Sequence, residues 1–187
     1  MKIIGITGTL GAGKGTIVDY LTTHYHFAHY SVRGYLIKVI TQRGLPVNRD
    51  SMVTVANELR TNNTPSFITD ELYKEAVREG QNAIIESIRT AGEVASLRKT
   101  EDFVLLAIDA DPKVRYQRIV QRNSETDHIS FETFLENEKR EMTASDPNKQ
   151  NLAACIRQAD FVLKNDDGFE KLYHQIDDVM KILNLKS

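Results

Sequence analysis

The sequence predicts an α/β protein in which helices cover both faces of a parallel sheet of about five strands. Short apolar runs such as "AIIES", "FVLLAID" and "FVLK" recur along the chain and are bounded by polar or turn residues, as buried strands are. Helix-like stretches separate these runs over the whole length, an alternation that is typical of parallel sheets. A chain of 187 residues with this pattern and no internal repeat is most simply a single domain, 1–187.

Five segments are expected to form strands, the second of them weakly: Lys2–Thr7, Phe27–Tyr30, Ala83–Ser87, Phe103–Asp109 and Phe161–Lys164. The segments expected to form helices are Gly15–Tyr25, Asp50–Thr61, Ser66–Glu79, Lys113–Arg122, Ser130–Met142, Asn151–Gln158 and Phe169–Leu183. Asp50, Ser66 and Ser130 are residue types that cap helices, and Pro112 stands where a first turn tolerates proline. Residues 42–65 carry two of the four prolines and little strand character, so we expect an insertion there at the carboxyl edge of the sheet.

Composition limits the class of partner. The formal net charge is -2, so the chain lacks the global basic field that nucleic-acid binders often carry, and we expect no nucleic-acid partner. The single cysteine, Cys155, cannot form an internal disulfide, which favours a reducing cytoplasm. No apolar stretch approaches the ~18 residues of a membrane span, so we expect no membrane partner. Monomer and homodimer both stay open.

The strongest motif follows the first expected strand. Gly8-Thr-Leu-Gly-Ala-Gly-Lys14 fits the pattern G-x-x-x-x-G-K and stands between a strand and a helix, as a phosphate-binding loop (P-loop) requires. Glycines let successive backbone N–H groups point inward as an anion nest, and the next helix adds its N-terminal dipole. Lys14 adds a point charge for the outer phosphates. The residues expected to bind ATP are Gly8, Gly11, Ala12, Gly13, Lys14, Gly15 and Thr16.

Two segments resemble a known family of enzymes. The loop "GAGKGT", in which Gly15 follows Lys14 and the hydroxyl arrives at Thr16, resembles the "GSGKGT" loop of adenylate kinases and other nucleoside monophosphate kinases. The segment "IIESIRT" is similar to their "LLDGFPRT" but is one residue shorter, because it lacks the proline. The resemblance implies a three-layer P-loop NTPase fold, a Mg²⁺ site that uses Thr16 and Glu86, and an acceptor phosphate on Arg89. A plain strand-end carboxylate is the alternative for Glu86.

A third segment, "RIVQR", resembles the family's "RIVGR" at the entry to a mobile lid. Arg118 and Arg122 stand four apart, on one helix face. The resemblance implies that they lie over the donor base and on the transferred phosphate, and a solvated helix face is the alternative. It also implies a lid over residues 122–142, in which Lys139 and Arg140 are candidate charges that move in with it.

The acceptor is the open question. "YSVRGYL" loosely matches a family segment that contacts the acceptor, which implies roles for Ser31 and Arg33 in an acceptor-binding insertion of about residues 31–80. Residues 159–176 resemble dephospho-CoA kinases instead, which phosphorylate a sugar hydroxyl and use a carboxylate base after the second strand. Phe27–Val47 contains no Asp or Glu and does contain Arg33, so an acceptor that brings its own anionic phosphate is favoured.

These features predict an ATP-dependent phosphotransferase that acts on a nucleoside or deoxynucleoside monophosphate. Phosphoryl transfer needs positioning and positive charge around the transferred group, which Lys14, Arg89 and Arg122 are expected to supply, with Mg²⁺ as cofactor. A dephospho-CoA kinase is the alternative. A nucleotide-binding switch or ATPase without a small-molecule acceptor is the alternative of another class, although such proteins tend to carry Ser or Thr directly after the loop lysine, where this chain has Gly15.

Overall fold

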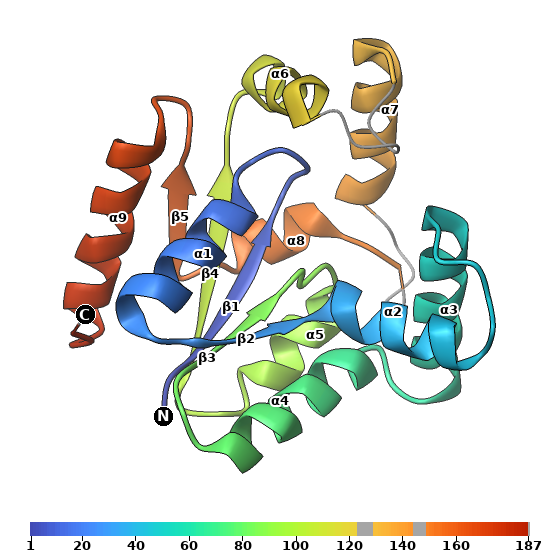
Figure 1. Cartoon of the computed structure of the whole chain (residues 1–187), viewed down its shortest axis with the longest axis horizontal. Helices are drawn as coiled ribbons and strands as arrows, with labels where there is room; N and C mark the ends of the chain where they lie inside the picture. Colours follow the sequence, from blue (N-terminus) through green and yellow to red (C-terminus); the bar gives the residue numbers. More distant parts are fainter. Residues whose placement is uncertain (123–128, 144–148, 187) are drawn as a thin grey trace.

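The computed structural model describes residues 1–122, 129–143 and 149–186, and a single parallel sheet forms their centre (Figure 1). Five strands lie in the order β2-β3-β1-β4-β5. Their bounds are Ile3–Gly8 for β1, Ala28–Ser31 for β2, Ala83–Glu86 for β3, Phe103–Asp109 for β4 and Phe161–Lys164 for β5. The predicted fold class, a parallel sheet with helices on both faces, is confirmed.

Helices cover both faces because side chains alternate along each strand. In β1, Ile4 and Ile6 face helices α1 (Lys14–Tyr25) and α9 (Phe169–Ile182), with which they form one buried apolar cluster. Ile3 points the other way, into a second cluster with α4 (Phe67–Glu79), α5 (Ala91–Leu97) and α8 (Leu152–Arg157).

The remaining helices lie beyond the carboxyl ends of the strands. Helices α2 (Val32–Gln42) and α3 (Arg49–Asn62) stand on one side in Figure 1, and α6 (Pro112–Arg122) and α7 (Phe131–Met142) stand above the sheet. The register pairs Ser31 and Ile6 with Glu86, so these strand ends meet at one edge. Ligands of open α/β sheets bind at this edge. Within the described ranges, no helix is long and apolar enough to cross a membrane.

Two helices were not predicted from the sequence. Helix α2 begins after Ser31, whose hydroxyl accepts a hydrogen bond from the Gly34 N–H, and it buries Val32, Leu36 and Ile40. Its β-branched residues and glycine lower its helix propensity, which packing against the core overrides. Helix α5 has a full capping box formed by Thr90 and Glu93.

The helices start within one residue of the predicted positions, but two of the predicted caps form differently. Helix α3 is capped by the side chain of Asn48 instead of Asp50, and α4 has no side-chain cap because the Ser66 hydroxyl donates to Asp70. Ser130 caps α7 as predicted, through the Thr133 N–H. Of the predicted lid, residues 123–128 lie outside the described part of the chain; the mobility of the segment stays a prediction, as do the bounds of the acceptor-binding insertion.

Candidate active site

The P-loop between β1 and α1 has a shape that requires glycine, as Gly8 and Gly13 show. Gly8 has φ 143°, and a Cβ added there would lie 2.2 Å from the Ile108 carbonyl oxygen. Gly13 has φ 104°, and its added Cβ would lie 2.3 Å from the Asn165 side-chain nitrogen. At Gly15, in contrast, an added Cβ would meet no protein atom within 4 Å, so packing does not explain the glycine there.

Asn165, which follows β5, holds the P-loop in place through its hydrogen bonds. Its Nδ2 donates to the Ala12 carbonyl at 2.8 Å, and its backbone N–H donates to the backbone carbonyl of Asp109 at 2.9 Å. Arg118 of α6 joins this network, because its Nη2 donates to the Asn165 carbonyl at 2.7 Å. The Arg118 Nη1 is buried and has no hydrogen-bond partner among the described residues. Arg118 therefore lies beside the P-loop, with a donor still to satisfy.

Lys14 stands at the start of α1 and turns back over the loop. Its ammonium group donates to the carbonyls of Gly8 and Thr9, at 3.0 and 2.9 Å. Burial and the positive charge of Arg89 lower the pKa of Lys14 to about 8, against the opposing effect of Glu86 and Glu141. Arg89 and Glu86, two residues of the "IIESIRT" segment, therefore lie within electrostatic reach of the P-loop lysine.

Glu86 ends β3 and stays ionised. Its Oε2 lies 3.1 Å from His29 Nε2, and this hydrogen bond, followed by the charges of His29 and Lys14, lowers the pKa of Glu86 against the effect of burial. Thr16 is half-buried in the first turn of α1. No group of three or more His, Cys, Asp or Glu that could hold a metal occurs among the residues described. Mg²⁺ in kinases is bound mainly by phosphates and water, with one or two protein oxygens.

Arg89 follows β3 and meets oxygen atoms on two sides. Its Nη1 donates to Glu141 Oε2 of α7 at 3.2 Å and to Gln150 Oε1 at 2.9 Å. Two of the predicted cations are exposed to solvent: Arg33 lies in the first turn of α2, and Arg122 lies at the end of α6. Ser31, predicted to contact the acceptor, uses its hydroxyl to cap α2.

Sequence reasoning missed Arg115, which is almost fully buried. Its Nε donates to the Ala110 carbonyl at 2.7 Å, its Nη1 to the Leu10 carbonyl of the P-loop at 3.3 Å, and its Nη2 to Glu138 of α7 at 2.9 Å. The spacing of residues 115, 118 and 122 along one helix face was a signal that could have revealed it.

Helix α7 also differs from the expectation for the lid. The predicted cations Lys139 and Arg140 are exposed, whereas Glu138 and Glu141 contact arginines that flank the P-loop. The helix therefore brings negative charge to the site in this structure.

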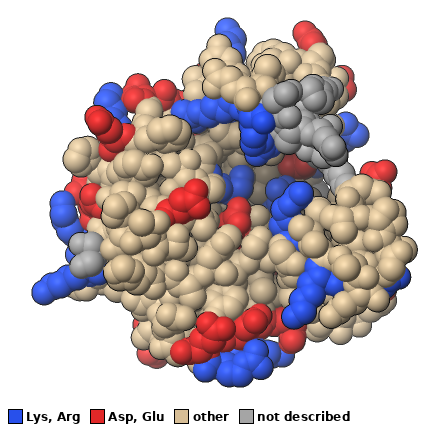
Figure 2. Space-filling view, viewed as in Figure 1, with Lys and Arg blue, Asp and Glu red and all other residues tan. Residues whose placement is uncertain are grey.

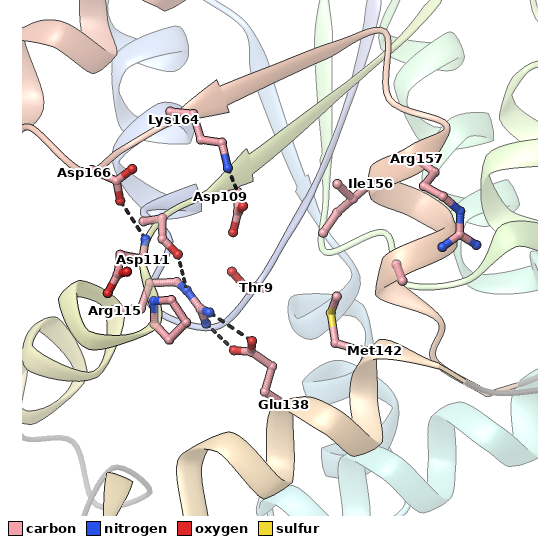
Figure 3. A pocket seen from close by; sticks show the side chains of 13 residues that line it. Thr9, Asp109, Asp111, Arg115, Glu138, Met142, Ile156, Arg157, Lys164 and Asp166 are labelled. Carbon is pink, nitrogen blue, oxygen red and sulfur yellow. Dashed lines mark hydrogen bonds and ion pairs between the residues drawn. The ribbon is translucent and has the colours of Figure 1, made fainter. Parts of the chain in front are cut away.

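A cavity of about 630 Å³ lies next to the P-loop, between the ends of β4 and β5 and helices α6, α7 and α8 (Figure 3). The ion pair of Lys164 with Asp109 lies on one side of it, and that of Arg115 with Glu138 on another. The hydroxyl oxygen of Thr9, which lines this cavity, is buried and has no partner among the described residues. The charged residues that line the cavity are of both signs.

The space-filling view shows a hollow in the face that carries the carboxyl ends of the strands (Figure 2). Basic side chains gather in it and around it, below α6 and beside α2 and α3. A glycine-rich loop at a helix N-terminus, a lysine and nearby arginines are groups of the kind that suit a polyphosphate.

This loop, in a parallel sheet of strand order 2-3-1-4-5, defines a P-loop protein of the kinase-like fold. A family profile described as an AAA domain matches residues 4–144, and the chain belongs to this family. It is also 30% identical to a UPF0200 protein of Methanocaldococcus jannaschii, over 98% of this chain and 92% of the relative.

Solved structures share the fold at low sequence identity. The protein TT1252 of Thermus thermophilus superposes with a TM-score of 0.66 at 18% identity, with 97% of each chain covered. A shikimate kinase of Bacteroides thetaiotaomicron superposes with a TM-score of 0.61 at 14% identity, covering 98% of this chain and 99% of that one. At these identities the likenesses show a shared fold.

Proposed function

We propose that the protein transfers the γ-phosphoryl group of ATP to a nucleoside or deoxynucleoside monophosphate. One observation carries the proposal: Arg89 lies in the turn that follows β3, the strand paired with the P-loop strand β1, and its charge acts on Lys14. Its guanidinium contacts a carboxylate and a carboxamide oxygen, and it has the geometry to bind phosphate oxygens in their place. Lys14 would then contact the transferred phosphoryl group from the side of the donor, and Arg89 would contact it from the side of the acceptor.

The residues present fit ATP and Mg²⁺. The P-loop offers a nest where Gly15 leaves open space, and the buried, unpartnered Nη1 of Arg118 is available to a ligand. Glu86 and Thr16 are the residues that would hold Mg²⁺, directly or through water. When bound, Mg²⁺ neutralises charge on the phosphate groups of the donor. Lys14 in its protonated form would bind the outer phosphates, and Arg89 would orient the acceptor phosphate.

The acceptor's chemistry removes the need for a base. A monophosphate is already anionic, so positioning and charge stabilisation are sufficient. The stretch from Phe27 to Val47, which has no carboxylate, and the exposed Arg33 in α2 suit such an acceptor. The cytoplasmic nucleotide pool would supply it.

A second candidate is transfer to a sugar hydroxyl, as in dephospho-CoA. Glu86 supports it, since an ionised carboxylate near Lys14 is placed to accept a hydroxyl proton.

A panel of acceptors separates these proposals. The protein is incubated with ATP and Mg²⁺ and, in turn, each common ribo- and deoxyribonucleoside monophosphate and dephospho-CoA, with ADP and phosphorylated product both measured. Transfer to a monophosphate supports the proposal. Transfer to dephospho-CoA alone overturns the choice of acceptor. ADP release that no acceptor stimulates, without a phosphorylated product, points to an ATPase or switch.

A further inference from the structure

The turn that carries Arg89, residues Ser87–Thr90, is unusually constrained. Ser87 has φ 73°, a region that residues other than glycine rarely occupy and that persists only where surrounding contacts enforce it. All four backbone N–H groups of the turn are hydrogen-bonded. Those of Ser87 and Ile88 both donate to the Ile6 carbonyl of β1 at 3.1 Å. The first half of the turn is therefore fixed to the P-loop strand.

The second half is fixed by one side chain. Glu93 Oε2 accepts hydrogen bonds from the N–H of Arg89 at 2.8 Å and from the N–H of Thr90 at 2.9 Å. The Arg89 carbonyl accepts a hydrogen bond from the Asn151 N–H, also at 2.8 Å. With its N–H and its carbonyl both held, the Arg89 backbone has little freedom, and its guanidinium extends from a fixed point.

Glu93 is fully buried, which requires a compensating charge. Arg60 of α3 supplies it, because its Nη2 lies 3.0 Å from Glu93 Oε1 and the Arg60 side chain is only 4% exposed. The two carboxylate oxygens thus have separate tasks: one pairs with Arg60, and the other binds the turn.

We propose that Glu93 is a positioning residue for phosphoryl transfer, which holds Arg89 at the acceptor phosphate through its backbone. Arg60 stabilises the buried charge and connects the acceptor-side helix α3 to this turn. The inference rests on the proposed function, since it gives Arg89 a substrate to bind. A misplacement of about 1 Å at such a group can cost on the order of 100-fold in rate.

A purely structural role predicts something different. Glu93 is also the third residue of the capping box of α5. A cap contributes to stability alone, so its loss would lower the unfolding midpoint and leave the acceptor KM unchanged. The two roles are therefore separable by kinetics.

The variants are chosen so that the protein folds. Glu93→Ala would leave the Arg60 charge buried and unpaired, which is strongly destabilising. The double variants R60M/E93Q and R60M/E93M remove both charges and keep the volume similar. They differ in the group at position 93: the glutamine oxygen can still accept from the Arg89 N–H, whereas the methionine side chain cannot. Each is the matched control for the other.

With the nucleoside monophosphate that the wild type uses best, R60M/E93M is expected to raise the acceptor KM at least about tenfold, with the ATP KM within about twofold of wild type. R60M/E93Q is expected to stay within about threefold of wild type for both. The unfolding midpoint in urea is measured for both variants. Equal acceptor KM values in the two double variants would overturn the inference.

A second measurement does not depend on activity. Residue-resolved hydrogen exchange of the Arg89 and Thr90 amides should be at least about tenfold faster in R60M/E93M than in R60M/E93Q, because only the latter retains their acceptor. If the wild type phosphorylates no monophosphate, the proposed function fails, and this exchange still tests whether Glu93 fixes the turn. Equal exchange in the two variants would show that it does not.

Discussion

The proposed donor side and the proposed acceptor side of the site are formed by different kinds of groups. On the donor side the backbone forms the binding surface: Gly8 and Gly13 adopt positive φ, and strand β4 and Asn165 approach too closely for any side chain. On the acceptor side the site depends on side-chain pairs that join distant parts of the chain. Arg60 and Glu93 are 33 residues apart, and Arg89 and Glu141 are 52 apart.

The difference has a consequence for ligand binding. The fold fixes the dipoles of a backbone nest, so their reorganisation costs little free energy when a phosphate binds. On the acceptor side, Arg89 contacts Glu141 and Gln150 in this structure. Arg89 must therefore exchange these partners for phosphate oxygens when an acceptor binds. We therefore expect substitutions on the donor side to abolish function and those on the acceptor side to tune it.

The largest effect is expected at Lys14. Lys14→Met should lower turnover at least about 100-fold, because it removes one preorganised charge from the transferred group. Turnover is measured at saturating ATP and acceptor, and folding is checked by thermal unfolding. Lys99→Met, at an exposed lysine away from the P-loop, serves as the control and should keep its turnover. A folded Lys14→Met variant with normal turnover would exclude Lys14 from the chemistry.

The next effect is expected on the acceptor side. Arg89→Lys should lower kcat/KM for the acceptor about 30-fold, since lysine cannot bind phosphate in a bidentate manner and charge-assisted hydrogen bonds contribute about 2 kcal/mol. The ATP dissociation constant, measured without acceptor, should change little. Arg33→Ala, at an exposed site, should show a weaker effect of the same kind. An equal loss of ATP affinity in Arg89→Lys would place Arg89 on the donor side.

The same contrast explains how much of the molecule could be predicted. The sheet and the P-loop follow from local patterns: strand runs, glycine spacing and the lysine after Gly13. The positions of Arg89 and Glu86 at the carboxyl edge follow from their place at a strand end. The contacts of Arg89 could not be predicted, because α7, α3 and the turn meet only through tertiary packing. Helix α2 was missed because burial of Val32, Leu36 and Ile40 outweighs its low helix propensity.

The acidity of Lys14 predicts a smaller, pH-dependent effect on the donor side. Its pKa is lowered to about 8 by burial and by Arg89, so it loses its proton in mildly alkaline solution. ATP affinity should therefore fall by up to about tenfold between pH 7 and 9 in equilibrium titrations, as the protonated fraction falls. Lys14→Met should show a flat profile, and a flat wild-type profile would contradict the lowered pKa.

Stability should change in the opposite direction. Between about 8 and the ordinary value of 10.5, the unfolded chain keeps a proton on Lys14 that the folded chain has lost. The free energy of unfolding without nucleotide should therefore rise with pH across this window, and Lys14→Met should remove that contribution.

The smallest effect is expected at Glu141, and it has the opposite sign to the others. Arg89 and Glu141 are partly exposed, at 28% and 21%, so their ion pair contributes at most about 1 kcal/mol. An acceptor phosphate that binds Arg89 must compete with this carboxylate. Glu141→Gln should therefore lower the acceptor KM about threefold, with a smaller change in ATP affinity at pH 7. Glu136→Gln, an exposed glutamate on the same helix, makes the same change of charge and should leave the acceptor KM unaltered.

The dependence of the acceptor KM on salt concentration tests this last prediction further. Because the Arg89–Glu141 pair is partly solvated, raising the ionic strength weakens it, and the difference in acceptor KM between wild type and Glu141→Gln should shrink. A rise in acceptor KM on Glu141→Gln would mean that α7 helps to hold the acceptor instead of competing with it. The acceptor side would then resemble the donor side, with a surface complete before its ligand arrives, and the contrast between the two regions would no longer hold.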